Sequence, residues 1–341
     1  MAVFLGLAIF ELIILLLYYG TKSQKQRKWL YIIGCVALFL VVGLRSITTG
    51  NDTKGYVERF LSDRSLEWSE VAVVHFEELG YYYFIKLIGC FTDNPQIFLL
   101  ITALASLIGI FDLIWQNSNS PVLSLFFYMT LGNFFFVLTG IRQAIAMSIC
   151  MLAVRFIQKR KLIWYVLLIW VAAQFHHSAY IFIVMYFLGV RKVNTISLFT
   201  NIVITIAAYF SYEKLLGVAN DILGYDYGVE ETGNGFVFFT ILLIISAFAL
   251  LTKNYWAKEK KKLVILNSGI ICNILWVFRL IGRTAERPTM YWLNIVPVML
   301  SESIESIDNY RTRMGLRLAA VGFALLFFAY RCRGMSYAFC F

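Results

Sequence analysis

A succession of long apolar runs, separated by short polar loops, is the feature that most restricts how this chain can fold. Of its 341 residues, 60% are hydrophobic and 15% are charged, whereas a soluble domain has roughly 45–50% apolar residues. Several runs approach the roughly 17–25 apolar residues that a helix needs to cross a bilayer. The runs are continuous rather than alternating, which indicates helices. The sequence therefore predicts an all-α polytopic membrane protein.

About 12 membrane-spanning helices are expected, in a single integral-membrane domain over residues 1–341. One of them returns from His177 to Arg191. The others are expected near residues 2–19, 29–44, 95–116, 121–138, 141–157, 162–175, 195–212, 236–252, 263–281, 288–303 and 314–330. The first run lacks a basic segment before it, so we interpret it as a retained helix rather than a cleaved signal. Residues 81–92 are apolar but short, and Lys86 interrupts them, which indicates an interfacial or re-entrant helix with a full span as the alternative.

Basic residues in the loops predict which side of the membrane each loop occupies. The net charge of +10 is carried largely by short loops such as 22–28, 159–161 and 253–262, and an excess of Lys and Arg is typical of cytoplasmic loops. This pattern places two loops outside: 45–93, which includes the interfacial helix, and 213–235. It also argues against a nucleic-acid partner, because the bases follow the membrane topology.

The six cysteines lie mostly inside apolar runs, form no CxxC pair and have no histidine at zinc-ligand spacing. Such cysteines pack as small hydrophobic side chains. We therefore expect neither a bound metal nor a cofactor.

The predicted topology brings an unusual set of polar residues to the outer face. They begin or end apolar runs, where ionisable groups are costly unless they have a partner or a function. The set comprises Arg45, Asp52, Tyr56, Glu77, Glu78, Arg142, Gln143, His176, His177, Arg279, Arg283, Glu286 and Arg287. The segment from Arg45 to Tyr56 directly follows an apolar run, and we expect it to form one wall of an external cleft.

Arginines dominate this set. Arg279, Arg283 and Arg287 are spaced by four residues and are expected on one helix face, where Glu286 can pair with one of them. Arg142 opens a helix whose N-terminal amides add partial positive charge. Guanidinium groups bind phosphate oxygens in bidentate geometry, so this cationic cluster suits a diphosphate. The alternative for each arginine is an interfacial position that faces lipid headgroups.

His176, Asp52 and Glu78 are candidate proton acceptors. A histidine at a helix end can act as a general base, and a hydrogen-bonded turn histidine is the alternative. Asp52 lies in a turn-prone stretch and Glu78 lies close to a helix N-terminus, where each carboxylate can instead serve the local backbone. Glu11, inside the first apolar run, is expected to relay protons or to pair with another helix.

Four short motifs occur in order along the first half of the chain. They are Arg45, Gly50, Asp52, Tyr56 and Phe60; then Glu78, Gly80 and Tyr81; then Gly140 to Ser148, with Arg142 and Gln143; then Phe175, His176, Ser178 and Ala179. Together they resemble the EpsG-type branch of the Wzy oligosaccharide-repeat-unit polymerases. The second half is similar only in its arginine-rich helix end and in Tyr291 after Arg287. Thr53 follows Asp52 where the family often has an aromatic residue.

The resemblance implies a GT-C-like glycosyltransferase of the bacterial cytoplasmic membrane whose active site faces outside. Such enzymes join undecaprenyl-diphosphate-linked repeat units into capsular, O-antigen or exopolysaccharide chains, and a chain-length regulator is a possible partner. The hypothesis that follows makes His176, or else Asp52 or Glu78, the base, with arginines supplying the countercharge. Diphosphate binding is assigned to Arg45, Arg142, Arg279, Arg283 and Arg287, and glycan binding to Tyr56, Tyr81, Gln143 and Tyr291.

Three other functions stay open on the sequence. A lipid-linked oligosaccharide flippase needs cations along a cavity reached from both sides of the membrane. A membrane O-acyltransferase needs a histidine in a hydrophobic helix and an acyl donor from the cytoplasm. An O-antigen ligase shares the polymerase chemistry and differs in its acceptor.

Overall fold

The computed structural model describes residues 1–341 except 212, 215–216, 219–220, 222–234, 283–285 and 341. The described part is helical, with one isolated antiparallel bridge between Arg45 and Phe339. The loop expected at 213–235 lies for the most part outside the described residues.

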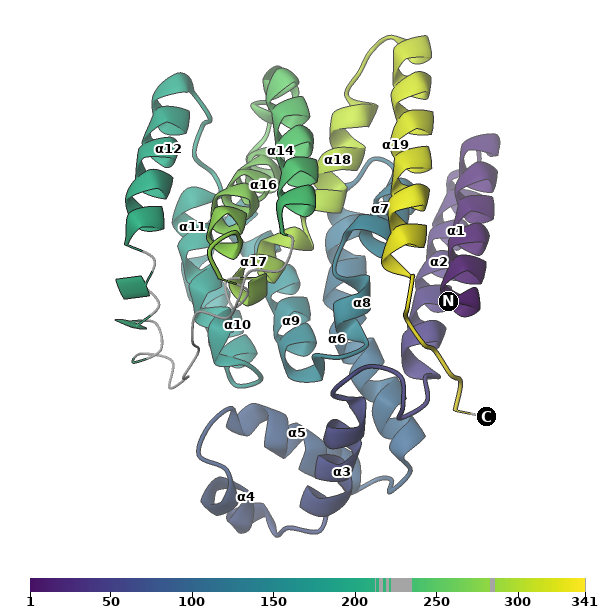
Figure 1. Cartoon of the computed structure of the whole chain (residues 1–341), viewed down its shortest axis with the longest axis vertical. Helices are drawn as coiled ribbons and strands as arrows, with labels where there is room; N and C mark the ends of the chain where they lie inside the picture. The colour runs from purple at the N-terminus through teal and green to yellow at the C-terminus, as the bar shows by residue number, and fades with distance from the viewer. Residues whose placement is uncertain (212, 215–216, 219–220, 222–234, 283–285, 341) are drawn as a thin grey trace.

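Among the described residues, six helices are long and apolar enough to cross a membrane. They are α1 (Ala2–Gly20), α2 (Gln24–Gly43), α6 (Pro95–Asn117), α9 (Ile141–Gln158), α16 (Lys260–Arg279) and α19 (Tyr310–Arg331). Shorter helices complete the bundle: α7 (Pro121–Leu131), α10 (Leu162–Ala173), α12 (Thr195–Phe210), α14 (Phe236–Leu251) and α15 (Lys253–Trp256). The prediction of an all-α polytopic membrane protein is confirmed (Figure 1).

Two of the expected continuous spans are broken, so those predictions are wrong, and the one expected from His177 is a single, shorter helical segment. The span at 121–138 is α7 followed by α8 (Phe134–Val137). The span at 288–303 is α17 (Glu286–Leu293) followed by α18 (Val296–Glu305). The helix after His177 is a 3-10 helix, η1 (His177–Val184), which continues into α11 (Met185–Leu188).

The break between α7 and α8 contacts the break between α17 and α18. Asn133, between α7 and α8, donates from Nδ2 to the Met290 carbonyl at 2.7 Å and to Asn294 Oδ1 at 3.0 Å. A β-carbon at Gly132 would lie only 2.6 Å from the Tyr128 carbonyl oxygen, so a glycine is needed there. Buried backbone groups at a helix end require partners. The side chain of Asn133 supplies one, and this tertiary bond makes the breaks tolerable inside an apolar run.

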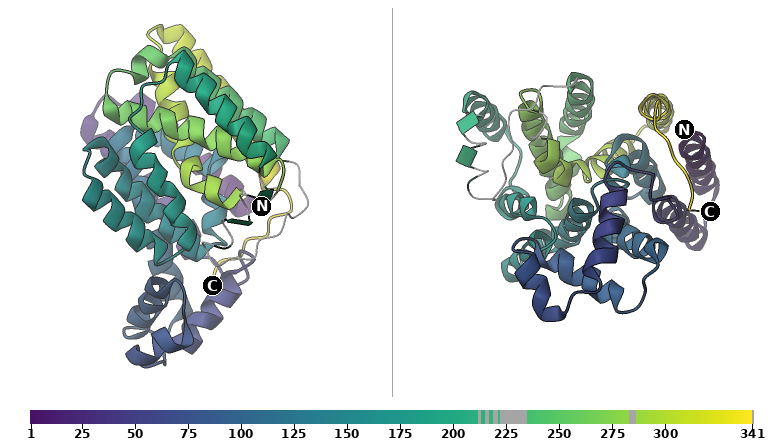
Figure 2. Two further views of the ribbon diagram at one scale, coloured as in Figure 1. Left: turned by 90° about the vertical axis from the view of Figure 1, so that its left-hand side faces the viewer. Right: turned by 60° about the horizontal axis from the view of Figure 1, so that its bottom comes forward.

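A separate layer of three short helices, the helical cap, crosses one end of the bundle (Figures 1 and 2). It consists of α3 (Thr53–Asp63), α4 (Trp68–Val74) and α5 (Leu79–Gly89). The short helix expected at 81–92 is α5, and it lies in the cap rather than among the bundle helices (Figure 1). The rings of Phe60 in α3 and Phe98 in α6 stack with centroids 4.6 Å apart, which fastens the cap to the bundle.

The C-terminal tail stabilises the turn that leads from α2 into the cap. The Ser46 amide donates to the Ala338 carbonyl at 2.8 Å, and the Cys340 amide donates to the Leu44 carbonyl at 3.1 Å. The tail therefore lies at the cap end of the bundle, as Figure 1 shows.

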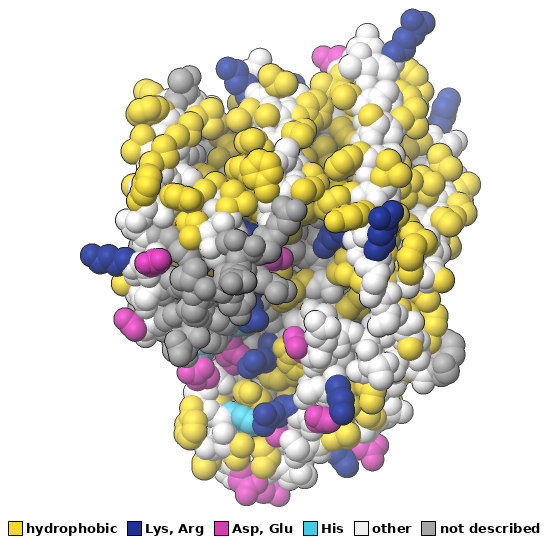
Figure 3. Space-filling view, in the orientation of Figure 1, with side chains coloured by type: hydrophobic (Ala, Val, Ile, Leu, Met, Phe, Trp, Pro, Cys, Tyr) yellow, Lys and Arg dark blue, Asp and Glu magenta, His cyan; other side chains and the backbone are white. Residues whose placement is uncertain are grey.

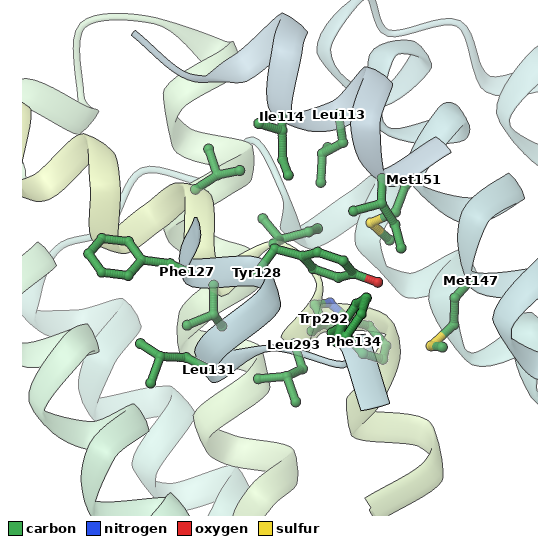
Figure 4. Close-up of a cluster of buried hydrophobic side chains, with 14 of the residues drawn as sticks. Leu113, Ile114, Phe127, Tyr128, Leu131, Phe134, Met147, Met151, Trp292 and Leu293 are labelled. Carbon is green, nitrogen blue, oxygen red and sulfur yellow. The ribbon is translucent and has the colours of Figure 1, made fainter. Parts of the chain in front are cut away.

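Closely packed side chains fill the centre of the bundle. Figure 4 shows Tyr128 of α7 surrounded by Leu113, Ile114, Met151 and Trp292, which come from α6, α9 and α17. Interiors packed at this density hold their helices in defined positions. The packing thus fixes α9 and α17, two of the elements that carry the candidate site.

Apolar side chains cover the surface of the bundle in Figure 3, above all over α12, α14 and α19. Charged side chains gather at the end away from the cap and around the cap itself. An apolar band between two polar ends is the surface expected of helices that cross a bilayer.

Candidate active site

The buried carboxylate of Glu78 is the centre of a polar cluster at the cap end. Its Oε2 accepts a hydrogen bond from Arg142 Nη1 at 2.6 Å. Its Oε1 lies 2.8 Å from His176 Nδ1 and accepts the His177 backbone amide at 3.0 Å. Only 3% of the Glu78 side chain is exposed. A buried carboxylate needs partners of this kind, so Glu78 holds the starts of two separate elements, α9 and η1, together.

Local backbone geometry places Glu78 there. It has φ 51° and ψ 40°, the left-handed conformation that is costly for a residue with a side chain. Gly80 follows, and a β-carbon at that position would lie 2.5 Å from the Gln174 β-carbon. The Tyr81 amide donates to the Gln174 carbonyl at 3.1 Å. Gly80 therefore lets the start of α5 approach the end of α10, two residues before His176.

The contact to Glu78 sets the tautomer of His176. A carboxylate only accepts hydrogen bonds, so Nδ1 carries the proton and Nε2 is the basic nitrogen of the neutral ring. The residue is 7% exposed and begins η1 in an extended conformation. This carboxylate–imidazole pair is the arrangement of a general base that is oriented by a second group.

Arg142 lies at the first turn of α9, where it contacts the cap as well as Glu78. Its guanidinium interacts with the Tyr56 hydroxyl and lies 5.9 Å from the centre of the Tyr81 ring. Burial raises the pKa of Tyr56, and the positive charge of Arg142 acts in the opposite direction. The Arg142 side chain is 37% exposed, so its remaining N–H groups can reach a ligand.

Two buried polar atoms beside Arg142 lack a hydrogen-bond partner among the described residues. They are the Tyr81 hydroxyl and Gln143 Oε1. Gln143 Nε2 donates to the Arg287 carbonyl at 2.8 Å, so the orientation of its amide is set. Unsatisfied buried polar atoms are rare in folded proteins and often mark a place that a ligand or water completes.

Helix α17 closes the cluster on its other side. The Tyr291 hydroxyl is 2.9 Å from Ser178 Oγ, which joins α17 to η1 directly after the two histidines. Together with the bond from Gln143 to Arg287, this contact brings the second half of the chain to the cluster. These contacts bring Tyr56 and Tyr81 to Arg142 and bring Gln143 and Tyr291 into the same cluster, and the assignment of the four residues to glycan binding stays a prediction.

The arginines near residue 280 are arranged differently from the prediction. Helix α16 ends at Arg279 and α17 begins at Glu286, so Arg279 and Arg287 do not share one helix face, and that prediction is wrong. Arg283 lies outside the described residues. Arg279 Nε donates to Glu286 Oε2 at 2.8 Å, which confirms the expected pairing of Glu286 with one of these arginines.

Arg45 and Asp52 lie in the α2–α3 turn. Arg45 is 1% exposed and donates to the Val42 carbonyl at 2.5 Å and to Thr53 Oγ1 at 3.5 Å. These bonds hold the guanidinium within the turn. Asp52 is exposed at the start of α3 and acts electrostatically on Tyr56, one helical turn further on. Phosphate binding by Arg45 and a proton-accepting role for Asp52 stay predictions.

A second histidine–carboxylate pair in the cap was not predicted. His75 Nε2 lies 2.9 Å from Asp63 Oδ2, and the imidazole stacks on the Tyr82 ring with centroids 3.5 Å apart. Both side chains are 8% exposed. The 12-residue separation spans helix α4, and no local sequence signal indicates such a contact.

The fold and this cluster define a class: a polytopic helical membrane protein with a buried carboxylate–histidine–arginine site at one end of its bundle. The family model described as "EpsG family" matches residues 28–341. The chain therefore belongs to the EpsG family, and membership places it among the membrane proteins of exopolysaccharide biosynthesis. Comparison with curated proteins and with solved structures gave no match.

Proposed function

We propose that this chain is a glycosyltransferase that polymerises lipid-linked oligosaccharide repeat units at the outer leaflet of a bacterial cell membrane. The observation that carries the proposal is the position of Glu78 between Arg142 and His176. Glu78 thereby brings together a positive charge, on Arg142, that can stabilise a leaving group and an oriented base, His176. Glycosyl transfer from a diphosphate requires both functions.

In the proposed reaction, His176 Nε2 accepts the proton of a hydroxyl on the acceptor glycan. That oxygen attacks the anomeric carbon of the donor, where a new C–O bond forms as the bond to the diphosphate oxygen breaks. The diphosphate leaves with the bonding electrons, and the exposed N–H groups of Arg142 stabilise its negative charge. The proton on His176 is later released to solvent or to the leaving group.

Glu78 is assigned a positioning role in this scheme. Its carboxylate accepts hydrogen bonds from Arg142, from the His177 backbone amide and from His176 Nδ1, so both of its oxygens are already held by groups of the protein. Glu78 instead fixes the tautomer of the neutral His176 ring, in which Nε2 is the basic nitrogen, and stabilises the imidazolium that forms when the base acts.

The remaining contacts support a binding site for the sugar. The unpartnered Tyr81 hydroxyl and Gln143 Oε1 supply one donor and one acceptor beside Arg142. Tyr56 adds an aromatic ring beside Arg142, and the buried Tyr291 supports the cluster through Ser178. We propose that the cap end faces outside, because the basic loops 22–28, 159–161 and 253–262 join helix ends on the side of the bundle away from the cap.

The test uses purified protein in lipid nanodiscs with undecaprenyl-diphosphate-linked repeat units. The proposal predicts longer lipid-linked glycans together with released undecaprenyl diphosphate, and loss of both products in His176→Ala and Arg142→Ala. Arg59→Ala, an exposed arginine of α3, is the matched control and should polymerise normally. Normal polymerisation by both site variants, or acyl transfer without glycan elongation, would overturn the proposal.

A further inference from the structure

A cavity opens on the side of the bundle, outside the Glu78 cluster. It has a volume of about 600 Å³ and lies between α8, α14, α16, α17 and α19. Most of its wall is apolar, including Phe136, Phe238, Trp276 and Phe327. In Figure 3 the apolar surfaces of α14 and α19 flank this region, which we call the lateral groove.

Charged side chains are confined to one part of the groove wall. Arg279, at the end of α16, Glu286, at the start of α17, and Arg331, at the end of α19, all line it. Arg279 pairs with Glu286 through Nε, and Glu286 also interacts electrostatically with Arg331. Among the described residues that line the groove, two arginines stand against one glutamate, which leaves one excess positive charge.

Arg279 still has an unused donor. Its side chain is 8% exposed, and Nη1 is buried without a hydrogen-bond partner among the described residues. A buried guanidinium N–H without an acceptor is costly, and an anion in the groove would satisfy it. Arg331 donates from Nη1 to the Gly132 carbonyl at 3.2 Å and packs 5.1 Å from the centre of the Phe135 ring. These contacts hold a second guanidinium, that of Arg331, in the wall of the same groove.

An entirely apolar crevice of about 10 Å³ adjoins the groove. It lies between α14 and α18 and shares Phe238 and Leu293 with the groove, and its other walls are Leu131, Ile241, Leu242, Ile245, Val296, Pro297 and Leu300. A ligand with an anionic head and a long hydrocarbon tail matches this division. The head would lie at Arg279 and Arg331, and the tail would follow α14 into the bilayer.

Helix α17 separates the groove from the Glu78 cluster. Glu286, Met290 and Leu293, spaced as one helix face, line the groove, while Tyr291 bonds to Ser178 in the cluster. Thr139 also lines the groove, three residues before Arg142. The groove therefore extends to the segment that leads into α9, the helix that carries Arg142.

We infer that the lateral groove binds the polyprenyl diphosphate of the lipid-linked donor, with Arg279 and Arg331 contacting the diphosphate and the α14 face contacting the isoprenoid tail. This inference rests on the proposed function for the identity of the lipid. It assigns a binding role to Arg331, a residue of the last helix, and it gives the donor a route from the bilayer towards the helix that carries Arg142.

A binding assay tests the groove without requiring turnover. Full-length protein in nanodiscs is titrated with radiolabelled undecaprenyl diphosphate, with inorganic pyrophosphate and phosphatidylglycerol as competitors. Arg331→Gln and Arg279→Gln should each weaken binding on the order of tenfold to a hundredfold, as expected for the loss of a charge-assisted bond. Arg333→Gln, an exposed arginine two residues further on, is the matched control and should bind normally.

A photocrosslink keeps the inference testable if an arginine variant fails to fold. Benzoylphenylalanine at Phe238 should crosslink to the polyprenyl lipid, whereas the same residue at Phe323, which is 49% exposed on α19, should not. Equal competition by phosphatidylglycerol or pyrophosphate, unchanged affinity in both arginine variants, or no crosslink at Phe238 would overturn the inference. Specific binding without glycan elongation would instead refute the proposed function and leave the lipid site standing.

Discussion

Replacing Glu78 by Gln is the most informative single substitution in the cluster, because it removes one charge and almost no volume. One orientation of the new amide keeps the bonds to His176 and His177 and turns its NH2 group towards Arg142, 2.6 Å from Oε2 in the wild type. The other orientation keeps the bond to Arg142 and places the NH2 group of the new amide against His176 Nδ1. Nδ1 must then accept a hydrogen bond, which favours the tautomer whose Nε2 carries the proton. Neither orientation satisfies all three groups.

The stability cost of Glu78→Gln follows from these contacts. Breaking a fully buried ion pair costs roughly 3–5 kcal/mol. Arg142 is 37% exposed, and solvent can replace part of what it loses. We therefore expect the free energy of unfolding to fall by only about 1–3 kcal/mol. The protein should remain folded in detergent at room temperature, with a lowered midpoint of thermal unfolding.

The cost in rate should be much larger. A base held in the wrong tautomer lowers kcat by a factor on the order of 10³–10⁴ in the best-studied carboxylate–histidine pair. We expect a loss of similar order in kcat for polymerisation and a smaller change in KM. His176→Ala and the double variant should show the same residual rate, because groups that act as a unit are not additive.

Glu77→Gln is the matched control, since it makes the same chemical change one residue earlier on an exposed side chain. It should leave stability within about 0.5 kcal/mol of wild type and leave kcat unchanged. Folded Glu78→Gln protein with wild-type kcat would refute the positioning role. The positioning role would also be refuted if Glu78→Gln lowered kcat by the same factor in the His176→Ala background as in the wild-type background.

Three further substitutions test the framework around the site. Gly50→Ala places a β-carbon 2.1 Å from the Leu138 carbonyl oxygen at a φ of 90°. We expect the free energy of unfolding to fall by about 2 kcal/mol or more, and an unchanged midpoint of thermal unfolding would contradict this contact. Gly80→Ala meets Gln174 at 2.5 Å and should lower kcat by displacing Glu78; wild-type activity would show that the close approach is not needed. Glu11→Leu removes a buried carboxyl group whose two oxygens have no hydrogen-bond partner in the described part of the chain, so it should raise stability by about 1–3 kcal/mol. A loss of stability would show that the carboxyl group has a favourable contact.

Much of the site was predictable because its residues are unusual for their surroundings. Glu78, Arg142 and His176 are ionisable groups at the ends of apolar runs, and the cost of burying them indicates a shared function. Their individual roles were not predictable. The left-handed backbone of Glu78 and contacts between residues 64 to 99 positions apart have no local sequence signal.

The fold was predictable where apolar runs are simple and not where they are interrupted. Hydrophobicity indicates that a segment is buried in protein or lipid. It does not indicate a break in a helix whose backbone groups are hydrogen-bonded by a residue far away in sequence, as the Met290 carbonyl is by Asn133. The cap helix α3 was missed because its buried positions are only one face of a mostly polar segment. Arg331 was missed because its partners, including the Gly132 carbonyl, lie far away in sequence.

We propose that His176, oriented by Glu78, is the base of a repeat-unit polymerase. The most direct test is the length distribution of the envelope glycan in cells whose only copy of this protein carries His176→Ala. We expect glycan limited to a single repeat at normal protein abundance, with full-length polymer restored by the wild-type chain. Full-length polymer in the His176→Ala cells would contradict it.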